Sequence, residues 1–172
     1  MGVDITLFVE HKDENTGEWN CVNLYRKDHQ TGNFEMVQPW EGRNSSLFMI
    51  LSQGDSWGYG YERCIVHDSR ELPDDISPQV KKRYEEMKDY CYGAACYDLY
   101  ELMLINETDR VNIYDDDWEP DEEKGETLED CPKVNIFEET KFLENIIYCL
   151  SAQWIYPYER FGENRVILWF DC

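Results

Sequence analysis

Two short segments of the sequence bring together residue types that bind zinc. Two residues separate Cys64 from His67, and four separate Cys91 from Cys96. Three thiolates and one imidazole form a ligand set that closed tetrahedral zinc sites use. A zinc site at Cys64, His67, Cys91 and Cys96 requires that folding bring the two segments together. The alternative is that the cysteines are small buried hydrophobic residues and that His67 lies at the surface.

The sequence contains none of the common catalytic motifs. It has no G-x-S-x-G, no H-E-x-x-H, no Walker A loop and no Rossmann fingerprint. Glu10 and His11 are adjacent, but neighbours in a strand point to opposite faces, so we do not expect them to act as a unit. We therefore predict a protein that is not an enzyme. A small hydrolase that uses the zinc ligands is the alternative.

The highest density of acidic residues in the sequence lies between residues 115 and 130. This segment holds ten Asp and Glu residues and one Lys, and the whole chain has a formal net charge of -21. A chain this acidic repels nucleic acid and anionic membranes, and it attracts basic surfaces. Its carboxylates can stand where phosphates would lie in a basic groove. The segment also contains a Trp, a residue type that interface hot spots favour.

We therefore predict a partner-binding set within this segment. Its members are seven acidic residues and one Trp: Asp115, Asp116, Asp117, Trp118, Glu119, Asp121, Glu122 and Glu123. The expected partner is a protein with a basic nucleic-acid-binding surface, not nucleic acid itself and not a membrane. The alternative is a solvated loop that only keeps the protein soluble.

The rest of the sequence predicts one folded α+β domain over residues 1–172. Hydrophobic residues make up 42% of the chain and aromatic residues 15%, which is too much apolar mass for a disordered acidic protein. Runs of β-prone residues predict an antiparallel sheet with strands at residues 3–10, 19–26, 34–37 and 165–170. The order of strands, then helices, then a last strand favours helices packed on one face of this sheet.

Helical patterns occupy much of the middle of the chain. We expect helices at residues 46–51, 78–90, 98–104 and 137–154. Ser77 followed by Pro78 is typical of a helix start, because a Ser side chain can cap the first N–H groups and Pro suits the first helical position. Residues 115–130 lack apolar periodicity and are expected to form a solvated loop.

The termini and cysteines indicate the compartment. The N-terminal segment lacks the basic and long apolar parts of a secretory signal, and no stretch approaches the ~20 apolar residues that span a bilayer. The seven cysteines are irregularly spaced, which favours thiols in a reducing compartment over a disulfide framework. We therefore expect a cytoplasmic protein.

Five short motifs run in order along nearly the whole chain. They are MGVDIT at residues 1–6 with Glu10 and Trp19 downstream, RNSSLF at 43–48, LPDDIS at 72–77, LYEL at 99–102 and RVILWFD at 165–171. This ordered set resembles an uncharacterised family of small proteins from bacteriophages and their bacterial hosts. The family's first strand carries Cys and His where this chain has Val3 and Thr6. Its His-Ser segment corresponds here to residues 90–96, which contain no His.

The resemblance implies a class of function. Small phage proteins of this kind are often inhibitors of host defence, including anti-CRISPR proteins that bind Cas nucleases. Together with the charge, the resemblance leads us to expect an inhibitor that binds a CRISPR effector such as Cas9 and blocks nucleic-acid loading or activation. A zinc protein or hydrolase of phage origin is one alternative. A phage accessory or structural protein is another.

Overall fold

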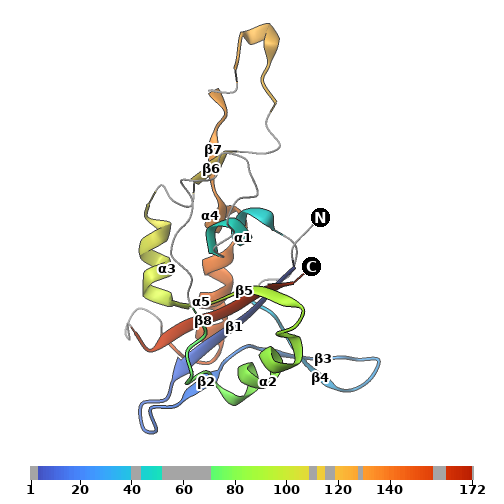
Figure 1. Ribbon diagram of the computed structural model, residues 1–172, viewed down its shortest axis with the longest axis vertical. Coiled ribbons are helices and arrows are strands. Elements are labelled where there is room, and N and C mark those ends of the chain that lie inside the picture. Colours follow the sequence, from blue (N-terminus) through green and yellow to red (C-terminus); the bar gives the residue numbers. More distant parts are fainter. Residues whose placement is uncertain are drawn as a thin grey trace.

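A four-stranded antiparallel sheet in the order β2-β1-β8-β5 forms the centre of the computed structural model (Figure 1). Its strands are β1 (Asp4–Lys12), β2 (Trp19–Cys21), β5 (Cys91–Asp98) and β8 (Asn164–Asp171). The structure describes residues 4–39, 44–51, 71–108, 112–114, 119–127, 130–156 and 162–171. The predicted α+β fold with an antiparallel sheet is confirmed, including the hairpin between β1 and β2 and the C-terminal strand.

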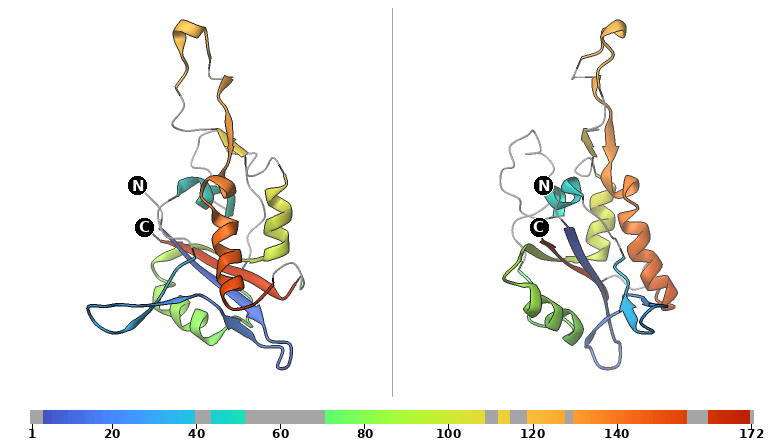
Figure 2. Two further views of the ribbon diagram at one scale, coloured as in Figure 1. Left: turned by 180° about the vertical axis from the view of Figure 1, so that it is seen from behind. Right: turned by 90° about the vertical axis from the view of Figure 1, so that its right-hand side faces the viewer.

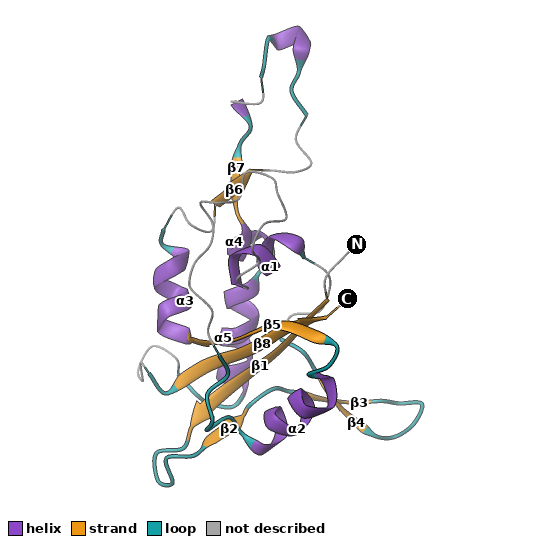
Figure 3. Ribbon diagram, in the orientation of Figure 1, coloured by secondary structure: helices purple, strands orange, loops and turns teal. Residues whose placement is uncertain are grey.

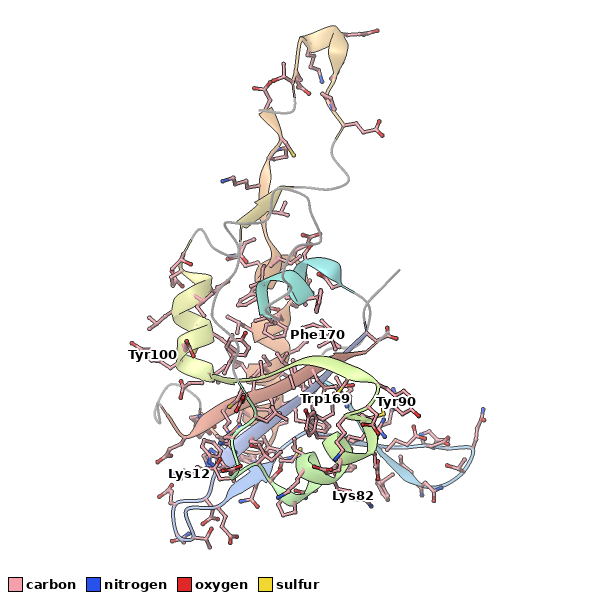
Figure 4. The ribbon with its side chains drawn as sticks, in the orientation of Figure 1. Lys12, Lys82, Tyr90, Tyr100, Trp169 and Phe170 are labelled. Atoms are coloured by element: carbon pink, nitrogen blue, oxygen red, sulfur yellow. The ribbon has the colours of Figure 1, made fainter. Side chains whose placement is uncertain are left out.

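The two central strands, β1 and β8, are buried on both faces. Successive side chains of a strand point to opposite faces. In β8, Leu168 and Phe170 enter the larger core, while Ile167 and Trp169 enter a smaller one. Figure 4 shows this alternation at Trp169, which lies toward α2, and Phe170, which lies toward α1. This two-sided burial explains why the β8 sequence is a continuous apolar run instead of an alternating one.

Four helices cover the face of the sheet that holds the larger core (Figure 3). They are α1 (Ser45–Leu51), α3 (Leu99–Asn106), α4 (Ile136–Glu139) and α5 (Phe142–Ala152). Three of them begin at a side chain that accepts hydrogen bonds from the first N–H groups. These N-terminal caps are Asn44, Asp98 and Asn135. The predicted packing of helices on one face holds for these four.

Helix α2 (Pro78–Met87) lies on the opposite face of the sheet, over Phe8 and Trp169. Val80 is its one fully buried residue among those described. Pro78 occupies the start of the helix as predicted, but Ser77 does not cap it with its side chain. The Ser77 backbone N–H donates to the Oε1 atom of Glu10 at 2.7 Å. The predicted Ser cap is therefore wrong, because Ser77 is held by its backbone.

Two other parts of the fold differ from the sequence predictions. The predicted helix over residues 137–154 is two helices, α4 and α5, because Lys141 adopts a left-handed conformation with φ 54°. Strand β5 was not predicted at all. Gly93, with φ 61°, lies at a bulge where the pairing of β5 with β8 shifts between Tyr92 and Ala95. Glycine adopts this conformation readily, and a bulge adds one residue to the strand.

Two short hairpins extend from the body of the molecule. One consists of β3 (Tyr25–Lys27) and β4 (Phe34–Met36), and the other of β6 (Asn112–Tyr114) and β7 (Lys133–Asn135). The chain between β6 and β7 makes the molecule elongated, because its described residues project far from the sheet (Figures 1 and 2). Within the described residues, none of the helices is long and apolar enough to cross a bilayer.

Candidate functional site

The projecting segment between β6 and β7 contains the acidic run, and we call it the acidic finger (residues 115–132). Its described residues lie beyond the β6–β7 pair, with the 3-10 turn Glu122–Lys124 at the far end (Figure 1). Asn135 holds its base, because its side chain donates to the Oδ1 atom of Asn106 at 3.0 Å and also caps α4. The finger is therefore tied to α3 and α4 while its tip stands in solvent.

Hydrogen bonds within the tip of the finger define its shape. The backbone N–H groups of Lys124 and Glu126 both donate to the carbonyl oxygen of Asp121, each at 3.1 Å. The Asp121 N–H donates to Glu126 Oε2, and Lys124 Nζ lies 2.8 Å from Asp121 Oδ2. Gly125 has φ 73°, which the turn requires and which glycine adopts at little cost. The tip is thus a closed turn and not a loose chain.

Hydrogen bonds within the finger favour the ionised state of two of its carboxylates, those of Asp121 and Asp130. The hydrogen bond from Lys124 lowers the pKa of Asp121 below its usual value. The backbone N–H of Thr127 and then its hydroxyl do the same for the pKa of Asp130. Both groups are therefore ionised at neutral pH. These two aspartates are therefore negatively charged before any partner binds.

The structure describes only part of the predicted partner-binding set. Asp115, Asp116, Asp117 and Trp118 lie outside the described residues, as does the side chain of Glu122. The remaining three divide into two kinds. Asp121 is used inside the turn, whereas Glu119 and Glu123 are exposed and their carboxylates accept none of the hydrogen bonds that hold the described tip. Glu119 and Glu123 are therefore the described carboxylates that are open to a partner.

The predicted zinc ligands are also only partly described. Cys64 and His67 lie outside the described residues. Cys91 and Cys96 lie on β5, and the bulge between them places both against the smaller core under α2, although an odd number of positions in the sequence, from 91 to 96, would put them on opposite faces of a regular strand. In the described part of the chain, no group of three or more His, Cys, Asp or Glu residues is arranged to hold a metal ion. The zinc site remains a prediction that the described residues support only by placing two thiols on one face.

Two other thiols are expected to be chemically inert. Burial raises the pKa of Cys21 to about 11 and also raises the pKa of Cys149. Because the thiolate is the reactive form, Cys21 should react with iodoacetamide at least about tenfold more slowly than glutathione near pH 8. Mass spectrometry of the labelled peptides measures this rate. In concentrated urea the difference should disappear, and equal rates in the native protein would contradict the assignment.

A buried ion pair between β1 and β8 is the strongest polar feature of the described body, and the motif search did not identify it. Glu10 is fully buried, and Arg165, directly opposite it in the sheet, is 8% exposed. The Nε atom of Arg165 donates to Glu10 Oε2 at 2.7 Å. The Ser77 N–H donates to the other carboxylate oxygen. Each oxygen of the Glu10 carboxylate therefore has a strong donor.

The same arginine binds the turn that precedes α2. Its Nη1 and Nη2 atoms donate to Asp75 Oδ1 at 2.7 Å and to the Asp75 carbonyl oxygen at 3.0 Å. Its guanidinium group lies over the Trp19 ring at 3.8 Å from the centroid, and the Trp19 indole N–H donates to Asp75 Oδ2. This hydrogen bonding by Arg165 lowers the pKa of Asp75. We call these five residues, Glu10, Trp19, Asp75, Ser77 and Arg165, the arginine cluster.

The arginine cluster joins three of the five motifs that carry the family resemblance. Glu10 and Trp19 follow the first motif, Asp75 and Ser77 belong to LPDDIS, and Arg165 opens RVILWFD. The motifs are distant in sequence, but the structure brings these positions into one contact network. The presence of one Glu, one Asp and one Arg in separate motifs is a sequence signal from which this cluster could have been predicted, but the motif search did not use it.

The arrangement of the cluster supports a structural role and not catalysis. Glu10 is fully buried, and both of its carboxylate oxygens already accept charge-assisted or backbone hydrogen bonds. A general base needs an oxygen within reach of a substrate proton. The cluster instead fastens the start of α2 to the sheet at β1, β2 and β8.

Comparisons with known protein families, with characterised proteins and with solved structures find no match.

Proposed function

We propose that this protein is an acidic, non-enzymatic inhibitor of phage origin that acts in the host cytoplasm. Its acidic finger enters a basic nucleic-acid-binding surface of a host defence protein, with a CRISPR effector such as Cas9 as the first partner to test. The observation that carries the proposal is the projection of exposed carboxylates, those of Glu119 and Glu123, from a hydrogen-bonded turn that lies away from the body of the molecule (Figure 2).

The form of the finger suits a groove more than a flat surface. A narrow arm can enter a channel lined by Lys and Arg, where a globular acidic face would touch only the rim. Electrostatic complementarity raises the rate of association and makes it depend on salt. The closed turn at the tip reduces the conformational entropy that binding would otherwise cost. The family resemblance supports the choice of a defence protein as the partner.

The test compares two variants with the same change in net charge. Glu119→Lys with Glu123→Lys reverses the two open carboxylates of the tip. Glu18→Lys with Glu107→Lys makes the same change at exposed positions of the body. DNA cleavage and DNA binding by Cas9 with its guide RNA are measured at low and moderate salt. The tip variant should inhibit about tenfold or more weakly than the wild type, and the body variant within about threefold of it.

Three outcomes count against the proposal. Failure of the wild-type protein to bind any defence nuclease at low salt would remove it. Equal inhibition by the tip and body variants would show that only net charge matters, and would remove the finger as the contact. Inhibition that does not weaken as salt rises would contradict an electrostatic contact. Circular dichroism of each variant shows whether the fold is intact.

A further inference from the structure

Trp154 is exposed and conformationally strained at the same time. Its side chain is 82% exposed, more than that of any other large hydrophobic residue described. Its φ angle is 62°, in the left-handed region that is sterically unfavourable for bulky side chains. Packing of a buried Trp can offset the free-energy cost of such a backbone conformation, but an exposed Trp gains little packing to offset it. The fold itself therefore gives no reason for Trp at this position.

The backbone around Trp154 shows which residue the fold would favour. The Trp154 N–H donates to the Ser151 carbonyl at 3.0 Å, and the Ile155 N–H donates to the Leu150 carbonyl at 3.0 Å. These two bonds define the Schellman motif that ends a helix, with Ile155 packing back on the core beside Leu150. In this motif the left-handed position is usually Gly and sometimes Asn. Trp154 occupies that position at the end of α5.

Two other aromatic residues lie at the same end of α5. Tyr148 is one turn before the helix ends and is 65% exposed, and Tyr156 follows two residues after Trp154 and is 54% exposed. We call Tyr148, Trp154 and Tyr156 the aromatic end of α5. The helix runs from the base of the finger to the other end of the body, so this surface lies far from the finger tip (Figure 2). It is therefore a second surface, separate from the finger.

The charge of the chain restricts what the aromatic end can bind. α5 itself carries one charged residue, Glu144, and no Lys or Arg. A second copy of a chain with net charge -21 is repelled, and so are nucleic acid and anionic membranes. The faces of Trp and Tyr rings attract cations, and guanidinium groups also stack on them. Exposed rings on a chain with net charge -21 are thus suited to arginine.

We propose that the aromatic end of α5 is a docking surface for an arginine-bearing segment of a partner protein. The strained conformation of Trp154 is retained because it presents the indole ring to solvent for this contact. Tyr148 and Tyr156 add two further exposed rings and hydroxyl groups at the same end of the helix. This surface does not depend on the finger, and it can bind its partner whether or not the finger does.

The test uses a synthetic peptide of alternating Gly and Arg and a matched peptide of Gly and Lys. The full-length protein is titrated with each at physiological salt, and the signal of the Trp154 indole N–H is followed by nuclear magnetic resonance. The arginine peptide should shift this signal more than the lysine peptide does. Trp154→Asn should weaken arginine-peptide binding about threefold, Trp154→Tyr should retain most of it, and Trp154→Asn with Tyr148→Ser and Tyr156→Ser should weaken it about tenfold.

A second measurement separates binding from folding. Asn tolerates the left-handed conformation, so Trp154→Asn should leave the melting temperature unchanged or raise it. A lowered melting temperature would assign Trp154 to the fold and overturn the proposal, as would unchanged peptide affinity. The series is repeated with Glu119→Lys and Glu123→Lys present. The same fold-changes in peptide affinity are expected with these two substitutions present. The result therefore tests the aromatic end even if the proposal for the finger fails.

Discussion

Replacing Arg165 with Met is expected to lower the free energy of unfolding by about 3–5 kcal/mol, a large share of the roughly 5–15 kcal/mol that stabilises a typical domain. The substitution keeps an unbranched apolar stem but removes the guanidinium group, so it leaves the Glu10 carboxylate buried with no opposite charge. Glu10 is fully buried, so water cannot replace the guanidinium group without opening the sheet. Urea denaturation followed by circular dichroism measures the effect.

The control removes both charges together. Arg165→Met combined with Glu10→Leu should recover most of the lost stability, because an apolar pair in a buried site is often as stable as the ion pair it replaces. Asp75→Asn should cost much less than Arg165→Met, because the Asp75 side chain is 64% exposed and its charge is screened. A double variant as unstable as the single one would show that Arg165 acts mainly through Asp75 and Trp19.

Acid is expected to weaken the interaction between Asp75 and Arg165 in the arginine cluster. Arg165 holds the pKa of Asp75 below its ordinary value of 3.8. The folded state therefore binds this proton more weakly than the unfolded state, and the contribution of Asp75 is complete above about pH 5. It is lost as the pH falls through the folded pKa. In Asp75→Asn this part of the acid sensitivity should be absent, which a series of urea titrations between neutral and acid pH can show.

Local patterns in the sequence were sufficient to predict the central strands and most of the helices. β1 alternates and β8 is continuously apolar, and both patterns follow from the faces that the strands bury. β5 could not be predicted in this way, because Gly93, Ala94 and Ala95, residue types that are depleted in strands, interrupt its β-prone tyrosines. Its extended form follows from pairing with β8, and its bulge at Gly93 follows from that pairing as well. The break at Lys141 lies between two segments with the same helical spacing, so periodicity alone did not reveal it.

The candidate sites also differ in how far they could be predicted from the sequence, because they depend on contacts over different distances along the chain. The acidic run is a local property of composition, so it was predicted directly from the sequence. Its projection as a finger depends on the pairing of β6 with β7 on either side of it, which joins residues about twenty positions apart. The arginine cluster depends on still longer range, because Glu10 and Arg165 come from opposite ends of the chain. The exposure of Trp154 follows from the Schellman turn that ends α5, and apolar spacing does not signal that turn.

Replacing Trp169 with Ala is expected to cost about 3–5 kcal/mol of the free energy of unfolding. Trp169 is fully buried in β8 and forms the centre of the smaller core. The centroid of its ring lies 5.1 Å from that of Phe8 and 5.4 Å from that of Tyr84 on α2. Val80 is the one fully buried residue that α2 contributes there, so loss of the indole ring removes much of what holds this helix to the sheet. Denaturation in urea and hydrogen exchange of the α2 amides measure the global and the local effect.

Trp169→Phe should be far less costly, about 1 kcal/mol or less. The indole N–H of Trp169 is buried and has no hydrogen-bond partner among the described residues, so the native protein already bears the cost of desolvating that donor. Phe loses some packing volume, but it removes this donor, and the two effects oppose each other. If Trp169→Phe is as destabilising as Trp169→Ala, the indole N–H is satisfied in solution and packing alone does not explain the residue. If it is close to neutral, Trp169 stabilises the attachment of α2 through its ring alone, and the polar fastening of that helix comes from the arginine cluster.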